Sequence, residues 1–202
     1  MSDDRGGAVG SPIGRADDEA APDDWAEAVL AYWFVTLTPA DWFKRSEVVD
    51  TDLTERFADV HAFVARQPED ALLTSARIAR AAIIVLDQLP RNMFRGDARA
   101  FATDHKALSL ASRAIALGFD QGLTADEALF VFLPFEHSES FADQHRAVAL
   151  ISELGNAVYA EFAVKHRDVI ERFGRFPHRN TVLGRETTPE EQAYLSSCGG
   201  FG

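Results

Sequence analysis

Apolar residues recur every three or four positions along most of the chain, and this spacing is typical of amphipathic α-helices. The pattern begins with Trp25, Val29 and Trp33, which lie about one helical turn apart. A clean apolar stripe then runs through residues 49–64, on a helix that we expect to begin near Ser46. The same spacing indicates further helices over residues 75–89, 103–117, 124–135, 141–154 and 156–173, with short helices beginning near residues 38 and 188.

The boundaries of these helices can be read from residues that satisfy or end a helix terminus. Gly118, Gly155 and Gly174 supply the left-handed residue that commonly follows a helix. Pro90 is expected to end the helix over residues 75–89, because proline disfavours helix at the preceding residue, and a polar loop over residues 92–101 would follow. The side chains that can cap helix N-termini include Asp24 (or Asp23), Ser75 (or Thr74), Thr103, and the capping-box residues Thr124 and Glu127.

No segment alternates cleanly between apolar and polar residues, and no Asn-Gly or Asp-Gly hairpin turn occurs. The sequence therefore predicts an all-α single domain of about eight or nine antiparallel helices over residues 23–202. Residues 1–22 are rich in Gly, Asp and Ala and show no periodicity, so we expect them to form a disordered acidic tail.

The charge of the chain limits the partners that it can have. The 202 residues carry a formal net charge of -12, and the sequence pI is near 4.9. This balance argues against binding to nucleic acid or to an anionic membrane, because both need exposed basic residues. The single cysteine excludes an intrachain disulfide, seven acidic residues among the first 24 are unlike a secretory signal, and no apolar run is long enough to span a membrane. We therefore expect a cytoplasmic protein.

One segment reverses the overall charge. Residues 166–180, HRDVIERFGRFPHRN, sum to about +2 when the histidines are neutral. Similar mixtures of charged, aromatic and proline residues occur over residues 86–96, 134–139 and 142–146. Asp87 and Gln88 directly follow an apolar run, so we expect this polar pair to face the interior in part and to need partners. The natural partners are Arg91, Arg95, Arg175, Arg179 and Arg185.

If these segments converge in space, their arginines and histidines would bind a small anion such as a phosphate or a carboxylate. A carboxyl group beside a histidine also suits general acid–base catalysis, so hydrolysis of the ligand is a further hypothesis. The catalytic candidates are Glu136, His137, His166 and Asp168, and the ligand-binding candidates are Asp87, Gln88, Arg91, Asn92, Arg95, Arg175, His178, Arg179 and Asn180.

Two alternatives use the same residues differently. The cluster would be purely structural if its ion pairs satisfy helix ends and lock the C-terminal segment onto the central helices. A helical array would instead act as a peptide-interaction module, with basic side chains on its concave face. No cofactor is expected, and the lack of a His-Glu-x-x-His motif or of paired cysteines predicts no metal site. The pattern leaves open both the oligomeric state and whether the protein is an enzyme.

Several segments together resemble a bacterial family known as domain of unknown function 924. The resemblance rests on AYWF, LDQLPRNMFRG, AFATDHKAL, FLPFEHSE and HRDVIERFGRFPHRNTVLGRETTPEE, and it covers roughly residues 25–195. It implies an all-helical fold related to tetratricopeptide-repeat domains, and it implies no established reaction, cofactor or catalytic residue. The segment ADQHRAVAL departs from the family pattern, which has an acidic residue at the position of His145, so His145 is not included among the candidates.

Overall fold

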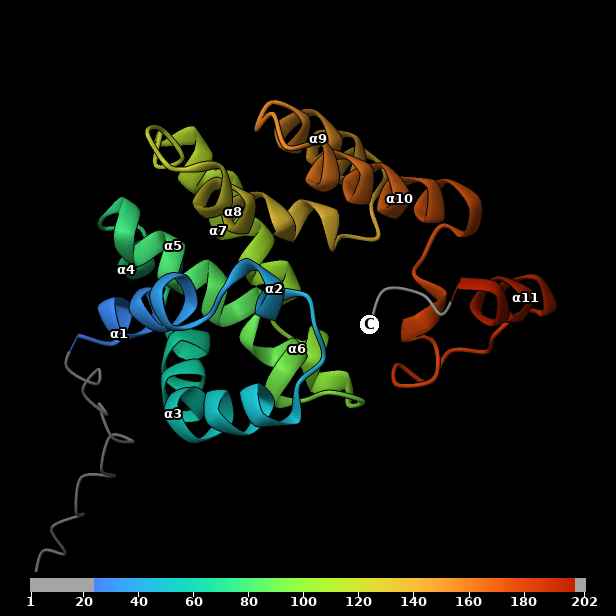
Figure 1. Cartoon of the computed structure of the whole chain (residues 1–202), viewed down its shortest axis with the longest axis horizontal. Coiled ribbons are helices and arrows are strands. Elements are labelled where there is room, and N and C mark those ends of the chain that lie inside the picture. The colour runs from blue at the N-terminus through green and yellow to red at the C-terminus, as the bar shows by residue number, and fades with distance from the viewer. Residues whose placement is uncertain (1–23, 199–202) are drawn as a thin grey trace, which may run out of the picture.

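Helices form nearly all of the regular structure in the computed structural model, which describes residues 24–198 (Figure 1). No β-strand occurs among those residues, so the prediction of an all-α fold is confirmed. The expected N-terminal tail over residues 1–22 lies outside the described residues. The elements are α1 Trp25–Ala31, the π-helical turn η1 Tyr32–Thr36, α2 Pro39–Trp42, α3 Glu47–Arg66, α4 Glu69–Leu72, α5 Ala76–Asp87, α6 Leu89–Met93, the 3-10 turn η2 Ala98–Phe101, α7 Asp104–Ala116, α8 Ala125–Glu136, α9 Phe141–Ser152, α10 Ala157–Phe173, the 3-10 turn η3 Pro177–Arg179, and α11 Pro189–Cys198.

Most helix starts lie where the capping residues predict them. The hydroxyl oxygens of Ser46 and Ser75 accept hydrogen bonds from backbone N–H groups three residues later, at 3.4 and 3.3 Å. Thr124 and Glu127 form the expected capping box at the start of α8. These devices act within one turn of chain, so a short stretch of sequence is enough to predict them.

Some local expectations are wrong. Residues 92–101 were expected to form a polar loop, but α6 and η2 occupy part of this stretch. Pro90 lies in the first turn of α6, where its missing N–H costs no helical hydrogen bond. Thr103 precedes α7, yet its hydroxyl donates to the carbonyl of Leu86 at 2.6 Å and does not cap the helix. The short helix α4 was also not predicted.

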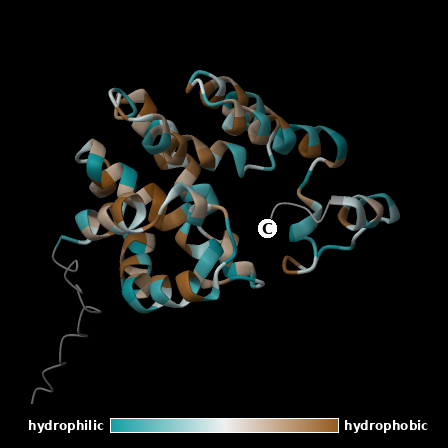
Figure 2. Cartoon of the chain, viewed as in Figure 1, coloured by the Kyte–Doolittle hydropathy of each residue, from teal (hydrophilic) through white to brown (hydrophobic). Residues whose placement is uncertain are grey.

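Two helices form the centre of the domain. In α5 all residues from Ala79 to Asp87 are buried, and in α8 all residues from Ala128 to Glu136 are buried. Hydrophobic residues make up most of both stretches (Figure 2), and they belong to one core cluster that also includes α1, α3, α7, α9 and α10. Each helix nevertheless ends in acidic and polar residues, Asp87-Gln88 in one case and Glu136-His137 in the other. The core therefore brings two polar helix ends into its interior.

Helices α8, α9 and α10 follow one another through short turns, so α8 and α10 run parallel with α9 antiparallel to both. Two contacts fix the alignment of α8 with α10. Near their N-termini, the Tyr159 hydroxyl donates to Asp126 Oδ1 at 2.7 Å. At the C-terminal end of α8 and in the middle of α10, His166 Nδ1 lies 3.0 Å from Glu136 Oε1. α8 therefore lies in register with the part of α10 that ends at His166.

The chain after α10 packs through a separate small cluster. Val169, Ile170 and Phe176 form this cluster, with Phe173 and Tyr194 packed against it. In Figure 1, α11 lies apart from the helices of the N-terminal half, whereas Arg179 of the same segment contacts Phe101 and Asp104. A relation to tetratricopeptide-repeat domains stays a prediction. Within residues 24–198, no helix is long and apolar enough to cross a membrane.

Candidate functional site

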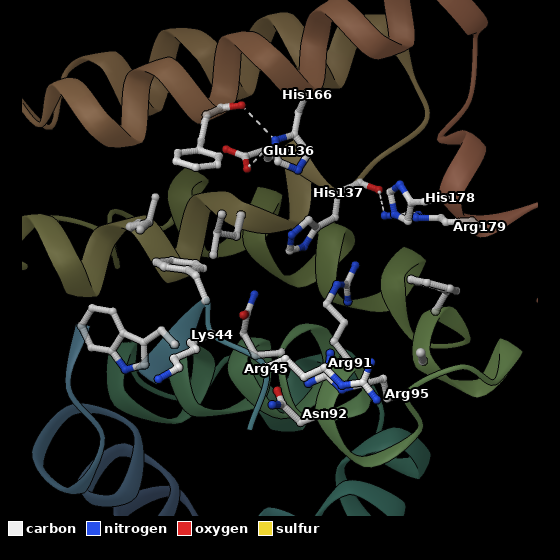
Figure 3. A pocket seen from close by; sticks show the side chains of 18 of the residues that line it. Lys44, Arg45, Arg91, Asn92, Arg95, Glu136, His137, His166, His178 and Arg179 are labelled. Carbon is white, nitrogen blue, oxygen red and sulfur yellow. Dashed lines mark hydrogen bonds and ion pairs between the residues drawn. The ribbon is translucent and has the colours of Figure 1, made fainter. Parts of the chain in front are cut away.

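A cavity of about 610 Å³ lies where the polar ends of α5 and α8 meet (Figure 3). In Figure 3, Glu136 and His166 lie on one wall of the cavity and Arg91, Asn92 and Arg95 lie on the facing wall. The lining residues are Trp42, Phe43, Lys44, Arg45, Gln88, Arg91, Asn92, Arg95, Gly96, Ala100, Phe101, Leu129, Leu133, Glu136, His137, Val158, Tyr159, Phe162, His166, His178, Arg179 and Val182.

Asp87 and His137 form the contact that joins α5 to α8. His137 Nδ1 lies 2.8 and 2.9 Å from the two carboxylate oxygens of Asp87, which is fully buried. The Asp87 carboxylate also accepts from Gln88 Nε2 at 2.5 Å and lies 3.4 Å from Arg91 Nη1. These partners outweigh the effect of burial and hold the pKa of Asp87 at about 2. An ionised carboxylate only accepts hydrogen bonds, so His137 Nδ1 carries a proton and donates it.

The protonation of His137 follows from its surroundings. Burial and the charge of Arg91 lower the pKa of His137, whereas Asp87 raises it, and the balance is downward. The ring is therefore neutral at neutral pH, and Nε2 is its unprotonated nitrogen. The side chain is 14% exposed and lines the cavity, so the geometry provides a base whose orientation is fixed by a buried carboxylate.

Arg91 and Arg179 share one carboxylate behind the cavity wall. Arg91 donates to both oxygens of Asp104 at 2.9 and 3.0 Å, and Arg179 Nη1 lies 3.4 Å from Asp104 Oδ2. The guanidinium of Arg179 is held between the rings of Phe101 and Phe176, with its central carbon 4.6 Å from each ring centroid. Burial lowers the pKa of Arg179 to about 10, so the group stays charged at neutral pH. Its buried Nε–H has no hydrogen-bond partner within the described part of the chain.

The cavity entrance carries further positive charge. Arg95 donates to Asp50 at 2.8 and 2.9 Å, and Asn92 donates to the same carboxylate at 2.8 Å. Lys44 and Arg45, between α2 and α3, are exposed, and within the described part of the chain their side chains form no ion pair or hydrogen bond. Their charges are therefore available to a ligand at little cost to the fold.

Glu136 and His166 form a second acid–histidine contact. His166 Nδ1 lies 2.9 Å from the carbonyl oxygen of Phe162 and 3.0 Å from Glu136 Oε1. Because the carbonyl only accepts, Nδ1 carries the proton. Burial lowers the pKa of His166 to about 3. Burial and the nearby charge of Asp87 raise the pKa of Glu136 to about 8, so both side chains are neutral at neutral pH.

Most of the candidates identified from sequence meet at this cavity. Asp87 lies directly behind the wall, against His137. Asp168 points away on α10, more than half exposed and paired with Arg167 at 2.5 Å, because residues two apart on a helix face different directions. Arg175 and Asn180 bind Glu191 outside the cavity. The candidates that line it are Gln88, Arg91, Asn92, Arg95, Glu136, His137, His166, His178 and Arg179.

Sequence reasoning did not identify two parts of the site. One is the pair of carboxylates, Asp50 and Asp104, that support the cavity arginines from behind. The other is the aromatic and basic turn with Phe43, Lys44 and Arg45. An aromatic residue beside two cations in a turn between helices was a visible signal, whereas Asp50 and Asp104 look like ordinary first-turn acids.

The arrangement suits anion binding better than metal binding. Of the described cavity-lining side chains, five are Lys or Arg and one, Glu136, is a carboxyl group. No group of three or more His, Cys, Asp and Glu side chains suited to a metal ion is found in residues 24–198. The cavity therefore presents hydrogen-bond donors and positive charge to whatever enters it.

The fold and this site define an all-helical protein with a large cavity lined by basic side chains. The family described as "Bacterial protein of unknown function (DUF924)" matches residues 29–199, and the chain belongs to this family. The structure is similar to that of a protein of unknown function from Agrobacterium tumefaciens, with a TM-score of 0.80 and 44% sequence identity. The match covers 84% of this chain and 96% of that chain. No curated protein matches the chain.

Proposed function

We propose that the protein binds a small molecule bearing a phosphate or carboxylate group in this cavity. The observation that carries the proposal is the contrast between the cavity and the chain: five basic side chains and one carboxyl group line the cavity, whereas the chain has a net charge of -12. Paired arginines and a buried, unpaired Arg179 Nε–H provide donors of the kind that recognise such anions.

The neutral state of Glu136 supports the same proposal. Burial and the nearby charge of Asp87 raise the pKa of Glu136 to about 8, which keeps its proton in place at neutral pH. At neutral pH the carboxyl group of Glu136 therefore does not repel an anion. It acts instead as a donor from its protonated oxygen.

A thermal-shift titration with inorganic phosphate and with acetate, at constant ionic strength, tests the proposal. A ligand at 100 times its Kd stabilises a protein by about 2.7 kcal/mol, which corresponds to a rise in Tm of several degrees for a chain of this size. The double variant Lys44→Gln/Arg45→Gln should keep the Tm of the free protein and lose part of the shift.

The matched control is Arg56→Gln/Arg113→Gln, which removes the same charge from two exposed residues that do not line the cavity. The proposal is wrong if neither anion stabilises the protein. It is also wrong if both double variants reduce the shift equally, since long-range charge would then account for it. Stabilisation by acidic peptides alone would favour the interaction-module alternative.

Hydrolysis is a second candidate function, and the Asp87–His137 contact favours it. Because Nδ1–H is donated to Asp87, His137 Nε2 is free to take a proton from water. The water oxygen would bond to the phosphorus or acyl carbon, and the leaving oxygen would take the proton of Glu136. No Ser, Thr or Cys is among the cavity-lining residues, so water is the nucleophile. Release of 4-nitrophenol from its phosphate and butanoate esters tests this, with His137→Asn expected to abolish it.

A cytoplasmic location is part of the proposal. The chain contains one cysteine and so cannot form an intrachain disulfide, which suits a reducing compartment. Fractionation of the native bacterium with detection by antibody is the test.

A further inference from the structure

We infer that the ligand is an amphipathic organic anion, whose charged group lies between the histidines and arginines and whose apolar part lies between residues 129–133 of α8 and residues 158–162 of α10. This inference rests on the proposed function and specifies its ligand class. It follows from how apolar and polar residues are distributed along the two helices.

Along both helices, the cavity-lining residues change from apolar to polar in the N-terminal to C-terminal direction. On α8 the cavity-lining residues run from Leu129 and Leu133 to Glu136. On α10 they run from Val158 and Phe162 to His166. Residues three or four positions apart share a helix face, so each set forms a continuous stripe.

The contacts between α8 and α10 place these stripes in register. The Tyr159–Asp126 hydrogen bond aligns the apolar ends, and the His166–Glu136 contact aligns the polar ends. The cavity therefore has one apolar end and one polar end, which is the shape of environment that an amphipathic molecule fits.

Unusually exposed hydrophobic side chains mark the apolar end. Phe43, Val158 and Phe162 are 60%, 57% and 46% exposed, and all three line the cavity. Of the eight large hydrophobic side chains exposed in the described part of the chain, these three gather at one opening. A cluster of this kind on a soluble surface marks a ligand site more often than chance exposure does.

The size of the cavity agrees with this class of ligand. At about 30 Å³ per water molecule, the 610 Å³ cavity holds roughly 20 waters. A bare phosphate or acetate would leave most of this space filled with water against Trp42, Leu129 and Leu133. An attached apolar group would displace that water and gain affinity through the hydrophobic effect.

Calorimetric titration of the full chain with acetate, butanoate, hexanoate and octanoate tests the inference. We expect Kd to fall by about fourfold for each added methylene group until the apolar end is filled. Primary alcohols of the same lengths, which lack the anion, should bind much more weakly.

The variant Phe43→Ala/Phe162→Ala should flatten this dependence on chain length, with a much larger loss of affinity for octanoate than for acetate. Val48→Ala/Phe141→Ala is the matched control, since both side chains are exposed and neither lines the cavity. If acetate and octanoate bind equally well, the inference is wrong and the proposed function stands. If none of the carboxylates binds and inorganic phosphate does not bind either, both fail. If the alcohols bind as tightly as the acids, the inference is also wrong.

Discussion

The Asp87 carboxylate accepts a hydrogen bond from His137 Nδ1 at 2.8 Å, and this contact joins the C-terminal ends of the two most deeply buried helices. Asp87 is fully buried and also faces Arg91 and Gln88. Its charge is thus compensated by partners from two elements, and each partner is oriented by it. The contact belongs to the structural core and to the candidate site at once.

Replacement of Asp87 by Asn should destabilise the protein strongly. The change leaves the partly buried Arg91 with less compensating charge, and the loss of one partner from a buried pair costs about 3–5 kcal/mol. Urea unfolding measures the difference. Asp70→Asn is the control, because Asp70 also pairs with an arginine, Arg113, but its side chain is 85% exposed. Similar losses in the two variants would contradict a special role for the buried pair.

Glu136 should make the protein less stable as pH rises from about 4.5 to about 8. Burial raises its pKa to about 8 in the folded protein, against an ordinary value of 4.5. Below pH 4.5 both states hold the proton, and between the two values only the folded state holds it, so stability is lost as pH rises through this window. Glu136→Gln removes the effect. Relative to the wild type, this variant should therefore gain stability, on the order of a few kcal/mol, between pH 5 and 8. A difference independent of pH would show that Glu136 ionises normally.

His166 should have the opposite effect on the pH dependence of stability, making the protein less stable as pH falls. Burial lowers its pKa to about 3 from an ordinary value of 6.5, so on acidification the unfolded chain takes up a proton that the folded protein does not. Stability is therefore lost as pH falls below 6.5, by about 2 kcal/mol at pH 5. Urea unfolding at pH 6.5 and at pH 5 measures this loss, which should be absent in His166→Gln. The ring resonances of His166 in the wild type should also stay constant over that range, and a titration midpoint near 6 would contradict the prediction.

The sequence predicts those parts of the fold that depend on neighbours within one turn. Ser46, Ser75 and the Thr124–Glu127 box bind backbone groups three residues away, so their roles follow from local pattern. The small helix α6 was not expected, because a proline that ends one helix can equally open the next. Local rules do not decide between these outcomes.

The site could be predicted in composition but not in arrangement. Charges beside apolar helix ends indicated a buried polar centre, and the structure brings nine of the predicted residues to one cavity. The ion pairs that support the arginines join residues far apart in the chain, such as Asp50 with Arg95 and Asp104 with Arg179. Local sequence therefore does not predict these pairs. Arg175 illustrates the limit, because its partner Glu191 lies in a short helix whose position follows from tertiary packing.

The last prediction concerns this C-terminal pair. Glu191 is 2% exposed and accepts hydrogen bonds from Arg175 at 2.7 and 3.0 Å, from Asn180 at 3.2 Å and from the Thr188 backbone at 2.8 Å. Glu191→Gln should weaken all of these at once, because the amide carries no charge and has one acceptor oxygen instead of two. The segment is then held by the small cluster around Phe176 and by the ion pair between Arg185 and Glu139. Amide hydrogen exchange in α11 and in residues 175–188 should accelerate by roughly tenfold, while α5 and α8 stay protected.

The adjacent residue provides the control for that experiment. Glu190 pairs with Arg172 at 2.9 Å, but its side chain is 65% exposed, so Glu190→Gln should change exchange very little.

The effect of Glu191 should also depend on pH. Its bonds to Arg175 lower its pKa to about 2, so its contribution is present above about pH 4.5 and is lost as pH falls toward 2. Equal exchange in the two variants, or acceleration across α5 and α8 as well, would show that the segment is not held separately through Glu191.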